Sequence, residues 1–168
     1  AAELVAVGEP VTVTLHVAGV TDLAGYQAGI DWDDALLAYD GVTALDWIAS
    51  SGRRMELIDP VVTGRSLDFL VYTAQPSPSE PVPGVTGEGD LAAIRFVALH
   101  AGRATITLRQ LLLTTTGNQP IAVERSNAIV TIGSNTIDPT PTTPPAPTST
   151  PDGEPHPHIY LPYAARRG

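Results

Sequence analysis

The stretch VTVTLHVAGVTDLAGYQAGIDWD, residues 11–33, decides the fold class. Its first part alternates apolar and polar side chains, and the apolar set is Val11, Val13, Leu15 and Val17. Its last part repeats the alternation, with the apolar set Tyr26, Ala28, Ile30 and Trp32. A period of two is typical of a strand with one buried face. We therefore predict strands over 11–17 and 25–33, and in the second strand the outward side chains are Gln27, Gly29, Asp31 and Asp33.

Six further stretches have strand composition and are bounded by Gly, Pro, Asp or Asn, which favour turns. They are Leu36–Leu45, Met55–Val61, Ser66–Ala74, Leu91–Leu99, Ala104–Leu113 and Ala128–Ile132. We find no sustained helical periodicity, and at most one helical turn fits near Asp46–Ser51 or Asp33–Leu37. Eight or nine short strands in some 130 residues predict an all-β sandwich or jelly roll.

The prolines mark the limits of this domain. Residues 75–89, QPSPSEPVPGVTGEG, are predicted to form a long surface loop, because proline lacks the N–H that an inner strand requires. After Gly133 the chain becomes rich in Pro and Thr, a composition that favours an extended spacer. We predict a β-sandwich over 1–133, a linker over 134–153, and a short C-terminal segment over 154–168, which contains HIYLPYAARR.

Composition excludes several classes of function. The net charge is −9 and there is no lysine, so phosphate backbones and anionic lipid surfaces are poor partners. The absence of cysteine excludes thiol nucleophiles, thiolate zinc sites and disulfides. No apolar run approaches the roughly 20 residues that span a bilayer. A first residue other than Met and the Pro/Thr-rich tail favour a secreted protein, at the cell surface or outside the cell.

No pattern in the sequence indicates catalysis or a cofactor. The acidic cluster Asp31, Asp33, Asp34 could suggest calcium, but an EF-hand register begun at Asp31 would need glycine at Leu36. Turn capping and hydrogen bonds to a partner explain these carboxylates better. The four histidines fall on an outward strand position, in a turn and in the tail, and no serine has the flanking glycines of a nucleophile elbow. We predict no catalytic residue and no bound metal.

Five segments, in order along the chain, resemble the cohesin family. They are VGEPVTVTLHV (7–17), GIDWDDALLAYDGVTAL (29–45), GEGDLAAIRFVAL (87–99), GRATITLRQLLL (102–113) and NAIVTIG (127–133). The resemblance implies a nine-stranded jelly roll, one face of which docks a dockerin, a small helical calcium-binding module. It places the docking face on the strands within 25–33, 55–61 and 66–74 and on part of 104–123. The chain departs from the family in its Pro-rich 75–89 loop and in having Trp32 where tyrosine is commoner.

The resemblance and the alternation together give a candidate partner-binding set. The resemblance carries over Asp33 as a hydrogen-bonding residue, Leu70 and Tyr72 as outward residues, and Thr73 at their rim. Alternation places Leu67, Phe69 and Val71 in the core and so exposes their neighbours. The predicted set is Gln27, Asp31, Asp33, Asp68, Leu70, Tyr72 and Thr73. An aromatic anchor with a polar surround is typical of protein interfaces; the alternative is that Tyr72 lies under the 75–89 loop and the carboxylates are ordinary surface.

Two other functions stay open at this level. Trp47, beside Asp46 and ahead of a turn, could stack on a sugar ring, as in carbohydrate-binding modules of the same architecture. Trp32 falls on the core side of its strand and is the poorer platform. The second alternative is a structural spacer domain of a surface protein. The interpretation favoured by the sequence is a non-catalytic module that docks a dockerin-type protein, with polysaccharide involved only indirectly.

Overall fold

The computed structural model describes residues 4–133, which form nine strands and one short 3-10 helix. The strands are β1 (Leu4–Ala6), β2 (Pro10–Trp32), β3 (Leu37–Ala44), β4 (Arg54–Thr63), β5 (Ser66–Ala74), β6 (Val85–Ala98), β7 (Gly102–Thr115), β8 (Pro120–Ile121) and β9 (Ala128–Gly133). The helix, η1, spans Asp46–Ala49, within one of the two places where a helical turn was predicted. This one helix of residues 4–133 is not long and apolar enough to cross a bilayer.

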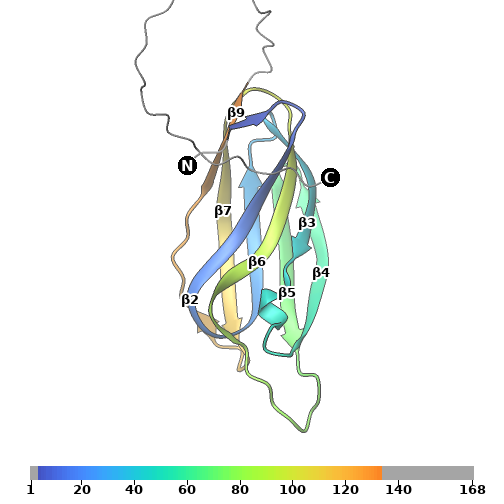
Figure 1. The fold of residues 1–168 in the computed structure, drawn as a ribbon, viewed down its shortest axis with the longest axis vertical. Helices are drawn as coiled ribbons and strands as arrows, with labels where there is room; N and C mark the ends of the chain where they lie inside the picture. Colours follow the sequence, from blue (N-terminus) through green and yellow to red (C-terminus); the bar gives the residue numbers. More distant parts are fainter. Residues whose placement is uncertain (1–3, 134–168) are drawn as a thin grey trace, which may run out of the picture. The chain divides into compact units, whose positions relative to one another are not determined.

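The strands form a two-layered β-sandwich, as predicted. One layer has the order β1-β9-β7-β2-β5-β4, and the other consists of β3, β6 and β2. Strand β2 belongs to both layers: its residues 10–23 pair with β6, and its residues 25–31 pair with β5 and β7. Figure 1 shows β2 and β6 crossing in front of β7 and β5. All neighbouring strands are antiparallel except β1 and β9, which are parallel.

The core lies between the layers and contains the apolar sets that alternation had predicted. Val11, Leu15 and Val17 from the first part of β2 belong to the same buried cluster as residues of its second part and of β5. The ring of Trp32 lies 5.8 Å from that of Tyr39 and 5.6 Å from that of Phe96, measured between centroids. The hydroxyl of Tyr26 donates a 2.7 Å hydrogen bond to the carbonyl oxygen of Leu91. The alternation therefore identified the buried face of both halves of β2.

Two boundaries differ from the prediction. The strands predicted over 11–17 and 25–33 are one strand of 23 residues, because the turn-like residues between them form bulges rather than a loop. Gly19 and Asp22 have φ angles of 70° and 56°, which bend the strand between layers without ending it. The predicted 75–89 loop is also too long, since β6 begins at Val85. The short strands β1 and β8 were not predicted.

The remaining loop, 75–84, is fixed by a buried arginine. Arg53 donates to the hydroxyl and carbonyl oxygens of Thr73, at 2.7 and 2.8 Å, and to the carbonyl of Val82 at 2.8 Å. Gln75 adds a reciprocal pair of hydrogen bonds with Val82. In Figure 1 this segment forms the long loop between β5 and β6 at the lower end of the sandwich. The loop leaves Tyr72 half exposed, at 42% of its full surface. The predicted linker 134–153 and C-terminal segment 154–168 lie outside the described residues.

Candidate partner-binding face

The outer side of β4, β5, β2 and β7 presents rows of side chains that run across the strands. Paired residues in neighbouring strands project from the same side of a sheet. The registers define four such rows: Glu56–Tyr72–Gly25–Thr114, Ile58–Leu70–Gln27–Leu112, Val61–Asp68–Gly29–Gln110 and Thr63–Ser66–Asp31–Thr107. Glycines apart, every one of these residues is partly or fully exposed. We call these sixteen residues, together with Arg109, the four-strand face.

One row is apolar apart from its centre. Ile58, Leu70 and Leu112 are exposed over 47%, 38% and 44% of their surfaces, and Gln27 lies between Leu70 and Leu112. Tyr72 is next to Leu70 on the same side of β5. Isolated exposed apolar residues are common, but three of them in one row, with Tyr72 beside Leu70, favour an interaction surface. This row gives the four-strand face its apolar contact area.

A charged cluster lies beside the apolar row. Arg109 Nη2 contacts both carboxylate oxygens of Asp68, at 2.7 and 2.9 Å, and Arg109 Nε contacts Asp31 Oδ1 at 3.2 Å. The Ser66 hydroxyl donates to the same oxygen of Asp31 at 2.7 Å. The hydrogen bonds to Asp31 and Asp68 raise the pKa of the Arg109 guanidinium, so it stays charged. The cluster therefore holds three charged side chains in fixed positions.

Gly29 makes the cluster possible. A Cβ atom added to this residue would lie 2.8 Å from Asp68 Oδ1 and 3.0 Å from Arg109 Nη2. The guanidinium group therefore lies against the strand backbone at the one position where no side chain projects. This arrangement keeps the middle of the face flat, which suits contact with a broad protein surface rather than with a small ligand.

Asp33 lies at one end of the face and has a local role as well. Its Oδ1 accepts a 3.1 Å hydrogen bond from the backbone N–H of Ala35, and its carbonyl accepts from Leu36 and Leu37. This is the turn capping that the sequence suggested for the acidic cluster. Asp33 also lines a shallow polar hollow with Asp31, Arg65 and Thr107. The carboxylate is half-buried and thus remains partly accessible.

The structure corrects the position expected for Thr73. This residue is 6% exposed, and its hydroxyl donates to the carbonyl of Ala24 while accepting from Arg53. Alternation explains the burial, because Thr73 follows Leu67, Phe69 and Val71 on the inner side of β5. The expected position at the rim, which came from the resemblance, is wrong. The other six predicted residues lie on the four-strand face or at its end.

Three residues of the four-strand face were not predicted from the sequence: Arg109, Ile58 and Leu112. Ile58 was within a predicted strand, and its outward phase follows from the alternation of Glu56 and Ile58 with Met55 and Leu57. Leu112 and Arg109 are separated by a register shift in β7 opposite Gly29 and Ile30. A bulge reverses the phase of all residues beyond it, so alternation within β7 could not place Arg109 beside Asp31 and Asp68.

The residues considered for sugar binding, catalysis and metal binding lie outside the four-strand face or have contacts of their own. Trp47 packs against the core, and a Cβ atom at Gly89 would overlap its indole ring, so the ring is partly covered rather than presented to a sugar. His16 is exposed and contacts Asp90 at 2.8 Å. Within residues 4–133, no three acidic, histidine or cysteine side chains are grouped so that they could hold a metal ion.

Comparison with known proteins gives one family and a consistent set of structures. The sequence model of the Cohesin domain matches residues 1–132. The cohesin module of a family 33 glycoside hydrolase from Clostridium perfringens superposes with a TM-score of 0.63 at 13% identity, covering 77% of this chain and 90% of that one. The sixth cohesin of Acetivibrio cellulolyticus scaffoldin B, solved in complex with a dockerin, gives 0.61 at 14% identity, with coverages of 78% and 95%.

A non-cellulosomal cohesin from the archaeon Archaeoglobus fulgidus gives a TM-score of 0.60 at 14% identity, covering 79% of this chain and 89% of that one. At these identities the superpositions establish the fold alone. No curated protein sequence matched the chain.

Proposed function

Because the chain belongs to the cohesin family, we propose that its β-sandwich binds a dockerin-type protein module through the four-strand face. Several of the structures that it resembles are cohesins solved together with a dockerin. The proposal assigns binding rather than catalysis to the domain. It also places the domain in an extracellular or cell-surface assembly, where polysaccharide would be contacted by other components.

The observation that carries the proposal is the composition of the four-strand face. An apolar row, Ile58, Leu70 and Leu112, lies beside the fixed charges of Asp31, Asp68 and Arg109. Protein interfaces combine apolar anchors with a polar surround, and a preformed sheet loses little conformational entropy on binding. The same face includes Gln27 and Tyr72, while Asp33 lies at its end.

The carboxylates indicate the chemistry of the partner. Asp31, Asp33 and Asp68 outnumber Arg109 and Arg65 by one charge at this end of the face. A partner surface with apolar side chains opposite Leu70 and basic side chains opposite Asp31 and Asp33 would complement the face. We therefore expect binding to weaken as the salt concentration rises.

The test measures binding to purified dockerin modules by isothermal titration calorimetry. Leu70→Asp places a charge at the centre of the apolar row. Since the loss of an interface hot spot costs about 2 kcal/mol or more, we expect affinity to fall by about 30-fold or more. Combining Asp33→Ala with Tyr72→Ala should also abolish measurable binding.

Leu99→Asp is the matched control for this test. Leu99 and Leu70 are both 38% exposed, but Leu99 lies beyond the end of β6 and outside the four-strand face. The control should bind like the unmodified protein. Equal losses in Leu70→Asp and Leu99→Asp would contradict the assignment of the face, and the absence of binding to a broad dockerin panel would contradict the proposed partner class.

A further inference from the structure

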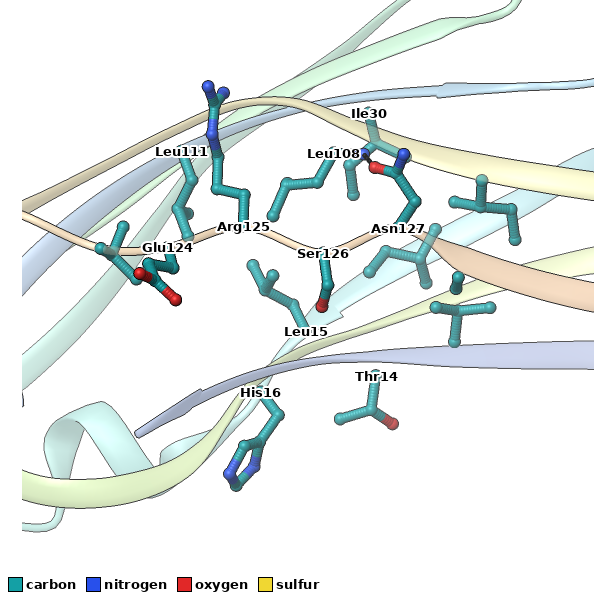
Figure 2. Close-up of a pocket in the computed structure, with 15 residues that line it drawn as sticks. Thr14, Leu15, His16, Ile30, Leu108, Leu111, Glu124, Arg125, Ser126 and Asn127 are labelled. Carbon is teal, nitrogen blue, oxygen red and sulfur yellow. Dashed lines mark hydrogen bonds between the residues drawn. The ribbon is translucent and has the colours of Figure 1, made fainter. Parts of the chain in front are cut away.

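A cleft on the side of the sandwich is separate from the four-strand face. It has a volume of about 210 Å³ and lies between the first half of β2 and the segment 123–128 that precedes and enters β9. In Figure 2 this segment passes over the opening, while Leu15, Ile30 and Leu108 lie around it. Protein interiors leave few voids larger than a water molecule, so an opening of this size onto core residues is unusual.

The lining of the cleft is continuous with the hydrophobic core. Leu15, Ile30, Ile94 and Ile106 all lie within the buried cluster and are at most 8% exposed. Leu108 and Leu111, also in the lining, are half-buried. Polar side chains, including His16, Glu124 and Arg125, occur at the rim. An occupant of the cleft would therefore place apolar side chains inward and would contact polar groups outside.

Two strand edges border the cleft without a partner strand. Residues 11–17 of β2 pair with β6 on one edge, and no strand in residues 4–133 pairs with the other. Residues 128–130 of β9 pair with β7, and no described strand pairs with their opposite edge. Unpaired edges offer backbone N–H and C=O groups to an added strand.

The edge of β9 that pairs with β1 continues into this cleft. Leu4, Val5 and Ala6 pair with Thr131, Ile132 and Gly133. Following the same edge of β9 backwards from Thr131 leads to Ala128, which lines the cleft. A strand inserted there would thus continue an existing edge pairing of the sheet.

The segment 122–127 is held to β7 by side chains instead of a strand ladder. Asn127 Oδ1 accepts from the backbone N–H of Leu108 at 3.1 Å, as the dashed line in Figure 2 shows. Arg125 donates to the carbonyl of Arg109 at 2.6 Å. These two contacts hold the segment against β7 in the gap between β8 and β9. A strand that enters on the side of the segment away from β7 would leave both contacts in place.

From these features we infer that the cleft is an acceptor site for an extended polypeptide strand of a different protein, with apolar side chains at every second position. The added strand would bond to the free edges of β2 and β9 and would bury its apolar side against Leu15 and Ile106. Addition of a strand to an exposed sheet edge is an established mode of peptide recognition, in which backbone bonds give affinity and side-chain pockets give selectivity. This inference does not depend on dockerin binding.

The experiment uses the full chain and a labelled, end-capped peptide of alternating valine and threonine. We expect saturable binding by fluorescence anisotropy, with NMR chemical-shift changes at Val13, Leu15 and Ala128 but not at Leu70. The same peptide with N-methylated backbone amides lacks the donors for strand pairing and should not bind. Ser126→Trp fills the cleft from an exposed lining position and should weaken binding by about tenfold or more.

Thr43→Trp, at an exposed position of β3 outside the cleft lining, is the matched control and should bind the peptide normally. Thermal unfolding of both variants verifies that they fold. Equal binding of the N-methylated peptide would overturn strand addition in favour of a simple apolar pocket. Binding that occurs only after residues 1–3 are deleted would assign the cleft to the chain's own end, and a dimer in sedimentation analysis would assign it to a second copy; either result overturns the inference.

Discussion

At the scale of single residues, Arg53 is a buried cation that donates its hydrogen bonds to neutral hydroxyl and carbonyl oxygens. Its three hydrogen bonds join β5 to the loop 75–84 through Thr73 and Val82. Hydrogen bonds from charged donors are stronger than neutral ones, and losing them leaves buried acceptors unpaired. The position of this loop therefore depends on one side chain.

We predict that Arg53→Met lowers the free energy of unfolding by about 2 kcal/mol, because Thr73 and Val82 lose their charged donor. Urea unfolding monitored by tryptophan fluorescence measures the change. Arg54→Met, at the exposed neighbouring position, is the control and should change stability by less than about 0.5 kcal/mol. Equal stability of the two variants would show that Arg53 does not hold the loop.

Asp22 gives the domain a defined dependence on pH. Its carboxylate accepts from the hydroxyl and N–H of Thr116 and from the N–H of Gly84, and these hydrogen bonds lower its pKa below the usual 3.8. A lowered folded-state pKa stabilises the protein above the unfolded pKa, and this contribution is lost as the pH falls through the folded value.

We predict that Asp22→Asn destabilises the domain by about 1 kcal/mol at pH 7, and that the difference shrinks below about pH 4. Asparagine tolerates the positive φ angle of 56° at this position, so the backbone is not strained by the change. Unfolding curves for both proteins between pH 3 and pH 7 measure the effect. A difference that stays constant across this range would contradict the role of the charge.

At the scale of strands, alternation predicted what a strand buries but not where a strand turns. The bounds of β5, Ser66–Ala74, were predicted to the residue, and its outward residues Asp68, Leu70 and Tyr72 are exposed or half-buried. The region around Gly19 and Asp22 has the composition of a turn, yet the two residues bend β2 through bulges. Local sequence could not distinguish these cases, because the choice depends on pairing with β6, which is distant in the chain.

The candidate site shows the same limit. Asp31 and Asp68 were predicted to face outward from their own strands, but the cation that joins them comes from β7. The bulge in β7 sets the phase of Arg109, and it forms only when β7 is paired with β2. Single residues of the face were thus predictable, whereas the charged cluster required the register of three strands.

Gly29→Ala tests the cluster at the level of the strand. The added methyl group would displace the Asp68 and Arg109 side chains, whose ends can move, so the backbone of β2 should be retained. We predict a fall in dockerin affinity of about tenfold with little change in melting temperature, measured by calorimetry on both properties. Gly117→Ala, where a Cβ would meet only the Thr115 hydroxyl oxygen at 3.8 Å, should change neither.

At the scale of the whole molecule, the domain boundary stays a prediction. The last described strand, β9, ends at Gly133, where the composition changes to proline and threonine. A segment of that composition buries too little apolar surface to stabilise a folded domain. We predict that a chain ending at Gly133 melts within about 2 °C of the full chain in differential scanning calorimetry. A larger fall would show that residues 134–168 contribute to the stability of the sandwich.

The membership of β2 in both layers has a consequence for how the domain opens. Residues 10–23 and 25–31 are one continuous backbone, so peeling β6 away loosens the strand on which β5 and β7 depend. Neither layer can melt as a separate foldon, and amide protons of β5 and β6 should exchange with deuterium at similar, globally limited rates. A shared strand of this kind makes the sandwich a single cooperative unit.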